Sequence, residues 1–146
     1  MEDRTFPGVG VWKLISDENL SEDGSVSYPI GKDGIGQIMY DAKGNMAAQV
    51  GNIHRPPFNV PDRLRGAPDE IKAAFEGYTA YFGTYTVDEK KGTVTHHVKS
   101  SLFPNWAGTD QVRYYEFSGN RLILKTEPML VGGKKVTAVI TWGRES

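Results

Sequence analysis

The chain has 146 residues, a formal net charge of −1 and no cysteine. These numbers exclude disulfides, thiol catalysis and thiolate metal sites, and the interspersed charges leave no basic face for nucleic acid. A chain of this length can bury a sufficient core without a metal, so we expect one domain over residues 1–146, with residues 1–8 as an N-terminal tail.

The beginning of the chain is acidic, and no apolar run approaches the roughly 20 residues that cross a bilayer. We therefore expect a cytoplasmic protein without a signal peptide or membrane insertion. We expect it to act as a monomer or a homodimer.

The first half of the chain contains short strand-like runs separated by polar, glycine-containing turns. The first run covers residues 11–19 and the second covers residues 34–40. The segment 41–44 is typical of a hairpin, because its last residue, Gly44, tolerates a positive φ. Residues 46–50 are therefore the predicted partner strand.

Residues 52–68 interrupt this pattern with a proline-rich, basic stretch. Proline removes a ladder donor, which predicts a loop over an end or edge of the sheet. From Pro68 the apolar period changes to three or four, with acidic residues in the first turn, and this predicts one short helix that ends around 77–80. Because long loops commonly carry function, the loop is a possible lid.

The second half returns to alternation. Strands are predicted at about 81–88, 93–101, 109–118, 121–127 and 134–143, each pair divided by turn residues. The total is about eight strands with one short helix between the third and the fourth. This predicts an all-β fold, a closed antiparallel up-and-down β-barrel.

The two ends of the chain carry residues that suit the closure of such a barrel. Trp12 lies in the first strand and Arg144 at the end of the last. We expect Trp12 to plug the narrow end and Arg144 to lie over its indole, a cation–π contact worth roughly 0.5–2 kcal/mol. The opposite end is then free to form the mouth of a ligand cavity.

Several motifs spread over nearly the whole chain support this fold. They are Gly10-x-Trp12, Tyr28-Pro-x-Gly31, Tyr40-Asp-x-x-Gly44-x-Met46, Tyr81-x-Gly-Thr-Tyr85, His96-His97-Val98, Pro104-Asn-Trp106-x-Gly108-Thr109-x-Gln111-x-Arg113, Leu122-x-Leu124 and Trp142-x-Arg144. Together they resemble the bacterial and fungal lipocalin-like domain family of the calycin superfamily. The resemblance implies a barrel around a small-molecule cavity and, by analogy with a few such barrels, allows an isomerase or a cyclase. Secreted lipocalins usually have disulfides and leaders, whereas this chain has no cysteine and we expect no leader.

Strand alternation sorts the candidate site residues, because alternate residues of a small barrel face its interior. In the strand at 93–101 the apolar face takes His96 inward and leaves His97 outward. In the strand at 109–118 apolarity does not decide, and the resemblance points to Gln111 and Arg113 as the inward pair.

Three side-chain types among the candidates suit chemistry on an oxygen-bearing molecule. An inward arginine can anchor a carboxylate, enolate or carbonyl oxygen, a histidine can exchange a proton near neutral pH, and a tyrosine can donate to a developing oxyanion. The predicted catalytic residues are His96, Arg113 and Tyr85. The predicted ligand-binding residues are Tyr40, His54, Phe75, Tyr78, Tyr81, Trp106, Gln111 and Tyr115.

Each of these candidates also has a structural interpretation. A buried arginine can neutralise Glu116 or Glu127, and a lone inward histidine can be a hydrogen-bonded core residue. Adjacent histidines point to opposite faces of a strand and do not chelate one ion, and no phosphate loop opens a helix. We therefore expect no metal and no cofactor.

Three functions remain open. The first is a barrel that binds a small hydrophobic, oxygen-bearing molecule. The second is a cofactor-free isomerase, cyclase or lyase that acts on such a molecule by acid–base chemistry in the same cavity. The third is a protein-interaction module with a collapsed interior, well below the ~300 Å³ of ordinary pockets.

Overall fold

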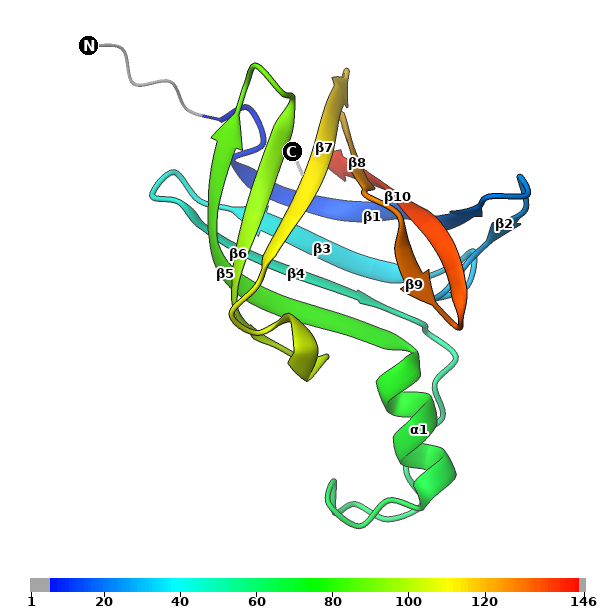
Figure 1. The fold of residues 1–146 in the computed structure, drawn as a ribbon. Coiled ribbons are helices and arrows are strands. Elements are labelled where there is room, and N and C mark those ends of the chain that lie inside the picture. The colour runs from blue at the N-terminus through cyan, green and yellow to red at the C-terminus, as the bar shows by residue number, and fades with distance from the viewer. Residues whose placement is uncertain (1–5, 145–146) are drawn as a thin grey trace.

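The computed structural model describes residues 6–144, which form one antiparallel sheet, one α-helix and one 3₁₀ turn (Figure 1). The strands are β1 (Gly10–Ser21), β2 (Val26–Ser27), β3 (Ile35–Tyr40), β4 (Asn45–Gly51), β5 (Tyr78–Asp88), β6 (Thr93–Ser101), β7 (Asp110–Ser118), β8 (Arg121–Thr126), β9 (Met129–Val131) and β10 (Lys134–Arg144). The helix is α1 (Pro68–Glu76), and the 3₁₀ turn is η1 (Pro104–Trp106). Within residues 6–144 neither helical element has the length and apolar character to span a bilayer.

The sheet closes into a barrel of eight strands, in the order β1, β3, β4, β5, β6, β7, β8 and β10. Pairing of β10 with β1 completes the ring, from Trp12 opposite Arg144 to Ser21 opposite Val136. The predicted closed barrel is confirmed, with α1 between the third and fourth strands of the ring. Two short strands pair outside the ring, β2 with β1 and β9 with β10. They were not predicted, because two or three residues are too few to show alternation.

Aromatic side chains fill one end of the barrel. The ring of Phe6 lies 5.3–5.8 Å, between centroids, from the rings of Tyr40, Tyr85, Tyr115 and Phe117. We call these five residues the aromatic plug. Phe6 is buried, so the N-terminal tail expected over residues 1–8 is shorter than predicted; residues 1–5 lie outside the described residues.

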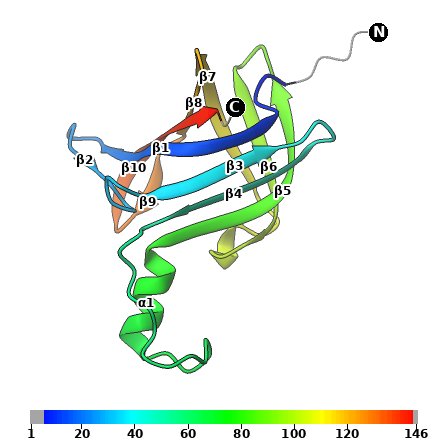
Figure 2. The ribbon, with the colours of Figure 1, turned by 180° about the vertical axis from the view of Figure 1, so that it is seen from behind.

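Trp12 closes the same end of the barrel. Its indole Nε1 donates a hydrogen bond to the carbonyl oxygen of Gly8 at 2.8 Å, and the guanidinium carbon of Arg144 lies 4.2 Å from the ring centroid. Arg144 also donates to the carbonyl oxygen of Val9 at 3.0 Å. The first and last strands of the ring therefore meet here, whereas α1 hangs from the opposite end (Figure 2).

Replacing Arg144 with leucine is expected to lower the free energy of unfolding by about 1–2 kcal/mol, because the cation–π contact and the hydrogen bonds to the N-terminal backbone are lost. Urea denaturation measures the change. The exposed loop residue Arg63 provides the control, since Arg63→Leu is expected to change stability by less than about 0.5 kcal/mol. Equal effects of the two substitutions would show that the contact with Trp12 contributes nothing.

A bulge in β1 changes which of its side chains face the interior. The register with β10 shifts between Leu14 and Ser16, and Ile15 turns outward with 41% of its surface exposed. Beyond the bulge, Asp17 and Asn19 are buried. Uninterrupted alternation would have placed Ser16 inward instead, so the bulge brings a carboxyl group into the barrel.

Candidate functional site

The half of the barrel away from Trp12 contains a cavity of about 490 Å³ that is open to solvent at one end. Its walls are mainly apolar and include Ile38, Val50, Phe103, Leu124, Met129 and Ile140. The volume exceeds the ~300 Å³ of the smallest ordinary ligand pockets, so the interior is not collapsed. A closed sheet of eight strands leaves room for one small molecule inside, and this cavity is the candidate site.

Arg113, on β7, is one of the two charged groups buried in the cavity wall. It is 6% exposed, its guanidinium carbon lies 5.8 Å from the ring centroid of Trp106, and its Nη1 donates to the carbonyl oxygen of Val112 at 3.2 Å. Within residues 6–144 it makes no ion pair with Glu116 or Glu127. The remaining guanidinium hydrogens are therefore available to an acceptor in the cavity.

Asp17, on β1, is the second buried charged group of the wall, and the sequence analysis missed it. Burial and, to a smaller extent, the charge of Glu18 raise the pKa of Asp17 to about 6. No described group donates a hydrogen bond to its carboxyl oxygens. At pH 7 the side chain is thus mostly ionised and presents an unpartnered acceptor to the cavity. No sequence signal marks the bulge that turns it inward.

Trp142 supplies the opposite kind of unpartnered group. Its side chain lines the cavity and is 2% exposed, and its Nε1 hydrogen has no acceptor among residues 6–144. A buried donor without a partner is unfavourable, by about 1–3 kcal/mol. Nε1 itself is buried below the cavity surface, so the donors that face a guest come from Arg113 and the acceptor from Asp17.

His96 lies beneath the cavity and is fully buried. The Tyr40 hydroxyl oxygen is 2.6 Å from its Nε2, and the Tyr81 hydroxyl oxygen is 2.8 Å from its Nδ1. Burial and then the nearby charge of Arg113 lower the pKa of His96 to about 3. The imidazole is neutral at physiological pH and has both nitrogens engaged, so it has no free nitrogen to offer a guest.

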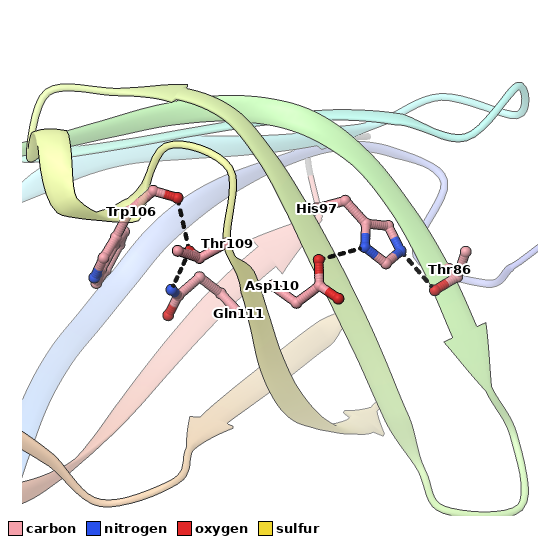
Figure 3. A network of polar contacts seen from close by, with 6 residues as sticks. All are labelled: Thr86, His97, Trp106, Thr109, Asp110 and Gln111. Atoms are coloured by element: carbon pink, nitrogen blue, oxygen red, sulfur yellow. Dashed lines mark hydrogen bonds and ion pairs between the residues drawn. The ribbon is translucent and has the colours of Figure 1, made fainter.

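Tyr81 and Trp106 both line the cavity, with their ring centroids 5.4 Å apart and nearly perpendicular. Gln111 does not line it. Its Nε2 donates to the Thr109 hydroxyl at 2.9 Å, and that hydroxyl donates to the backbone oxygen of Trp106 at 2.7 Å (Figure 3). Gln111 therefore holds the η1 turn, and through it the position of Trp106.

The other predicted residues of the strands lie in the aromatic plug. Tyr85 donates its hydroxyl hydrogen to the backbone oxygen of Asp41 at 2.6 Å, away from the cavity. Tyr40 and Tyr115 pack against Phe6. None of the three predicted plug residues is among the side chains that line the cavity, so ligand contact by Tyr40 and Tyr115, and catalysis by Tyr85, have no geometric support.

The three predicted residues of the loop and helix lie outside the cavity as well. His54 is exposed and pairs with Asp33 at 2.7 Å, Phe75 is exposed, and Tyr78 packs under Arg55 on the outer face. The loop at 52–68 is tied to α1, where the Glu70 carboxylate accepts from the backbone of Asn59 and of Ala67. From loop and helix together, only Glu76 reaches the lining, so a lid has no support here.

His97 points outward from β6, as the alternation predicts. Its Nδ1 lies 2.7 Å from the Asp110 carboxylate and its Nε2 lies 2.9 Å from the Thr86 hydroxyl (Figure 3). In the part of the chain that the structure describes, no three His, Asp or Glu side chains gather as metal ligands.

Comparisons with known proteins give three findings. The family model described as "Lipocalin-like domain" matches residues 9–145. The 4'-hydroxy-3'-methoxypropiophenone carrier protein ppsC of Aspergillus oryzae is 34% identical over 104 residues, which cover 66% of this chain and 94% of the relative. Among solved structures, the REP1-NXSQ fatty acid transporter has a TM-score of 0.42 and 11% identity over 94% of this chain and 96% of that chain, too low to support an argument.

Proposed function

The chain belongs to the lipocalin-like domain family, and we propose that its barrel is a carrier that binds a small aromatic molecule with at least two oxygen atoms. The cavity of about 490 Å³ is the observation that supports this proposal, because its walls are mainly apolar and the Asp17 carboxylate in them has no hydrogen-bond donor among the described residues. Small-molecule binding as such is supported by the barrel and by the curated relative named as a carrier.

The aromatic body of the guest accounts for most of the affinity. Apolar surface removed from water contributes about 25 cal/mol per Å², so an aryl ring that buries about 150 Å² gains about 4 kcal/mol before the cost of association. Trp106 and Tyr81 offer ring faces and edges for this contact. The polar groups of the wall then determine the orientation of the guest and contribute less to its affinity than the apolar contacts do.

In our proposal the class of guest follows the molecule for which the relative is named. A 4'-hydroxy-3'-methoxypropiophenone has a benzene ring, a phenol hydroxyl, a methoxy group and a ketone. In our proposal the phenol hydroxyl donates a hydrogen bond to the Asp17 carboxylate. The ketone oxygen accepts a hydrogen bond at the side of the cavity where Arg113 lies. A ligand that is both donor and acceptor pairs with the Asp17 carboxylate and with the guanidinium hydrogens of Arg113.

The enzyme alternative needs a group that exchanges protons with the guest. His96 does not supply one, because both of its nitrogens are hydrogen-bonded and its pKa is lowered to about 3. Tyr85 is bonded to Asp41 at the plug. The predicted catalytic residues His96 and Tyr85 thus give the enzyme alternative no support. Asp17, with its pKa of about 6, is the group of the wall that can exchange a proton instead, so recovery of the ketone unchanged distinguishes the carrier from the enzyme.

Titration with 4'-hydroxy-3'-methoxypropiophenone tests the proposed function. Trp106 and Trp142 line the cavity, so we expect binding to change tryptophan fluorescence, with the ketone recovered chemically unchanged after incubation. A new product would support the enzyme instead. The absence of any binding, for this ketone and for simpler aryl ketones, would contradict the carrier.

Replacing Arg113 with methionine is expected to weaken binding of the ketone about tenfold, because a charge-assisted hydrogen bond is lost and the apolar stem is kept. Isothermal titration calorimetry measures the change. Arg121, exposed at the start of β8, provides the control substitution Arg121→Met, which should bind as the wild type does. Unchanged affinity in both variants would show that Arg113 lines the cavity without forming a hydrogen bond to the ketone.

A further inference from the structure

Tyr40, His96 and Tyr81 form a hydrogen-bonded chain that leads from the aromatic plug to the cavity. Tyr40 comes from β3, His96 from β6 and Tyr81 from β5, and the two contacts measure 2.6 and 2.8 Å. Tyr40 is 2% exposed, and His96 is the only hydrogen-bond partner of its hydroxyl among residues 6–144. At the other end of the chain, Tyr81 lines the cavity.

The positions of the hydrogens in this chain follow from counting donors and acceptors. A neutral imidazole has one N–H donor and one nitrogen acceptor, so one tyrosine must donate to His96 and the other must accept from it. In the first arrangement Tyr40 donates to Nε2 and Nδ1–H donates to the Tyr81 oxygen. In the second arrangement Tyr81 donates to Nδ1 and Nε2–H donates to the Tyr40 oxygen.

The surroundings of Tyr40 decide between the two. In the second arrangement its own hydroxyl hydrogen would be buried in the aromatic plug without an acceptor, and buried donors are rarely left unpaired. The first arrangement leaves no such hydrogen in the plug. It places the free hydrogen on Tyr81, at the cavity, where a guest oxygen or water can accept it.

Arg113 reinforces the first arrangement. Burial raises the pKa of Tyr81, and the charge of the adjacent guanidinium opposes this shift. A guanidinium only donates, so Arg113 does not accept the hydrogen of the Tyr81 hydroxyl. That hydrogen is left for the cavity, and it is polarised by the bond that the Tyr81 oxygen accepts from His96.

We propose that Tyr40 and His96 fix the Tyr81 hydroxyl as a hydrogen-bond donor to the carbonyl oxygen of the bound molecule. The inference rests on the proposed function and assigns the ketone end of the guest to Tyr81. Tyr81 is the contact residue, and Tyr40 and His96 are positioning residues. A carbonyl oxygen, which accepts and does not donate, fits this place, whereas a group that only donates does not.

The protonation of His96 is measurable in the ligand-free protein. Long-range ¹H–¹⁵N spectra of protein labelled in its histidines distinguish a protonated ring nitrogen from an unprotonated one. We expect the His96 signals to show a proton on Nδ1 and none on Nε2, unchanged between pH 5 and 8. The reverse tautomer would overturn the proposal. Because no ligand is needed, this result is independent of whether the proposed guest binds.

A pair of ligands tests the donor role of Tyr81. 2-Methoxy-4-propylphenol has the skeleton of 4'-hydroxy-3'-methoxypropiophenone with CH₂ in place of the carbonyl group. Tyr81→Phe is expected to raise the Kd of the ketone about tenfold and to leave the Kd of the propylphenol unchanged. Tyr114→Phe, which removes an exposed hydroxyl on the outer face of β7, should alter neither.

The carbonyl stretching frequency of the bound ketone gives a direct signature. We expect a hydrogen-bonded frequency in the wild-type complex and a higher one in Tyr81→Phe. Equal losses of affinity for both ligands, or a wild-type frequency as high as in hexane, would overturn the donor assignment; the second criterion holds even if Tyr81→Phe does not fold. If neither ligand binds the wild type, the proposed function fails. The His96 tautomer then shows by itself which of the two hydrogen-bond arrangements is present.

Discussion

Asp17→Asn is expected to raise the free energy of unfolding at pH 7.5 by about 3 kcal/mol. The pKa of Asp17 is raised from 3.8 to about 6 by burial, so the ionised carboxylate is unfavourable in the folded barrel. An amide of similar shape removes that charge. Urea denaturation of the two proteins measures the difference.

The pH dependence of this difference has a definite sign. The folded state binds the Asp17 proton more tightly than the unfolded chain, so this group lowers stability as the pH rises from about 4 to about 6. Above that range its effect is constant, and below about pH 4 it vanishes. Other aspartates, such as Asp41, have lowered pKa values and act in the opposite sense, so the variant must be compared with the wild type at each pH.

Asp69→Asn provides the matched control, since Asp69 is exposed in the first turn of α1 and should change stability by less than about 0.5 kcal/mol. We also expect Asp17→Asn to weaken binding of 4'-hydroxy-3'-methoxypropiophenone about tenfold, because a carboxylate is the stronger acceptor for a phenol. A gain in stability with a loss of affinity is the pattern of a binding residue. An unchanged unfolding curve at every pH would show that the carboxylate is solvated.

Trp12→Ala is expected to lower the free energy of unfolding by about 3–5 kcal/mol, the largest loss among the substitutions considered. The indole is 1% exposed, donates to Gly8, packs against Phe117 and lies under Arg144. Its removal leaves a cavity at the point where β1 and β10 close the ring. Since domains are stable by about 5–15 kcal/mol, the variant should be near its unfolding midpoint in mild denaturant.

Trp106→Ala gives the opposite pattern and serves as the comparison. Trp106 lies in the η1 turn at the cavity wall and is only partly buried. Its removal should cost less than about 1.5 kcal/mol of stability and should abolish most of the affinity for an aryl ketone. Equal losses of stability in the two tryptophan variants would contradict the assignment of Trp12 to closure and Trp106 to the guest.

Much of the fold follows from simple periodicity. Alternating apolar residues and glycine turns predict the eight strands of the ring, and the change of period after Pro68 predicts α1. The same alternation predicts that His96 faces inward, and Arg113 faces inward as the family resemblance implies; both are buried. The Gly-x-Trp strand and the final arginine are enough to predict which ends of β1 and β10 meet.

Alternation reports the face of a residue but not its depth along the barrel. Tyr81 and Tyr85 lie on the same face of β5, four residues or about 13 Å apart, and only the first lines the cavity. The second belongs to the aromatic plug. This distinction depends on how strands are staggered around the ring, which local sequence does not contain.

Asp17 was missed for a different reason. The β1 bulge at Ile15 has no glycine or proline to mark it, and it reverses the face of every later residue of the strand. Loop 52–68 is irregular, as its proline content predicts, but proline content does not predict the direction in which a loop runs. The loop packs against α1 through Asn59 and Glu70 instead of covering the cavity.

The aromatic plug and the cavity occupy opposite ends of one barrel, with His96 between them. The residues that close the barrel are therefore separate from those that line the cavity. Substitutions in the walls around Trp106 and Met129 are therefore expected to change the selectivity of the cavity at little cost in stability, because Phe6 and Trp12 hold the other end.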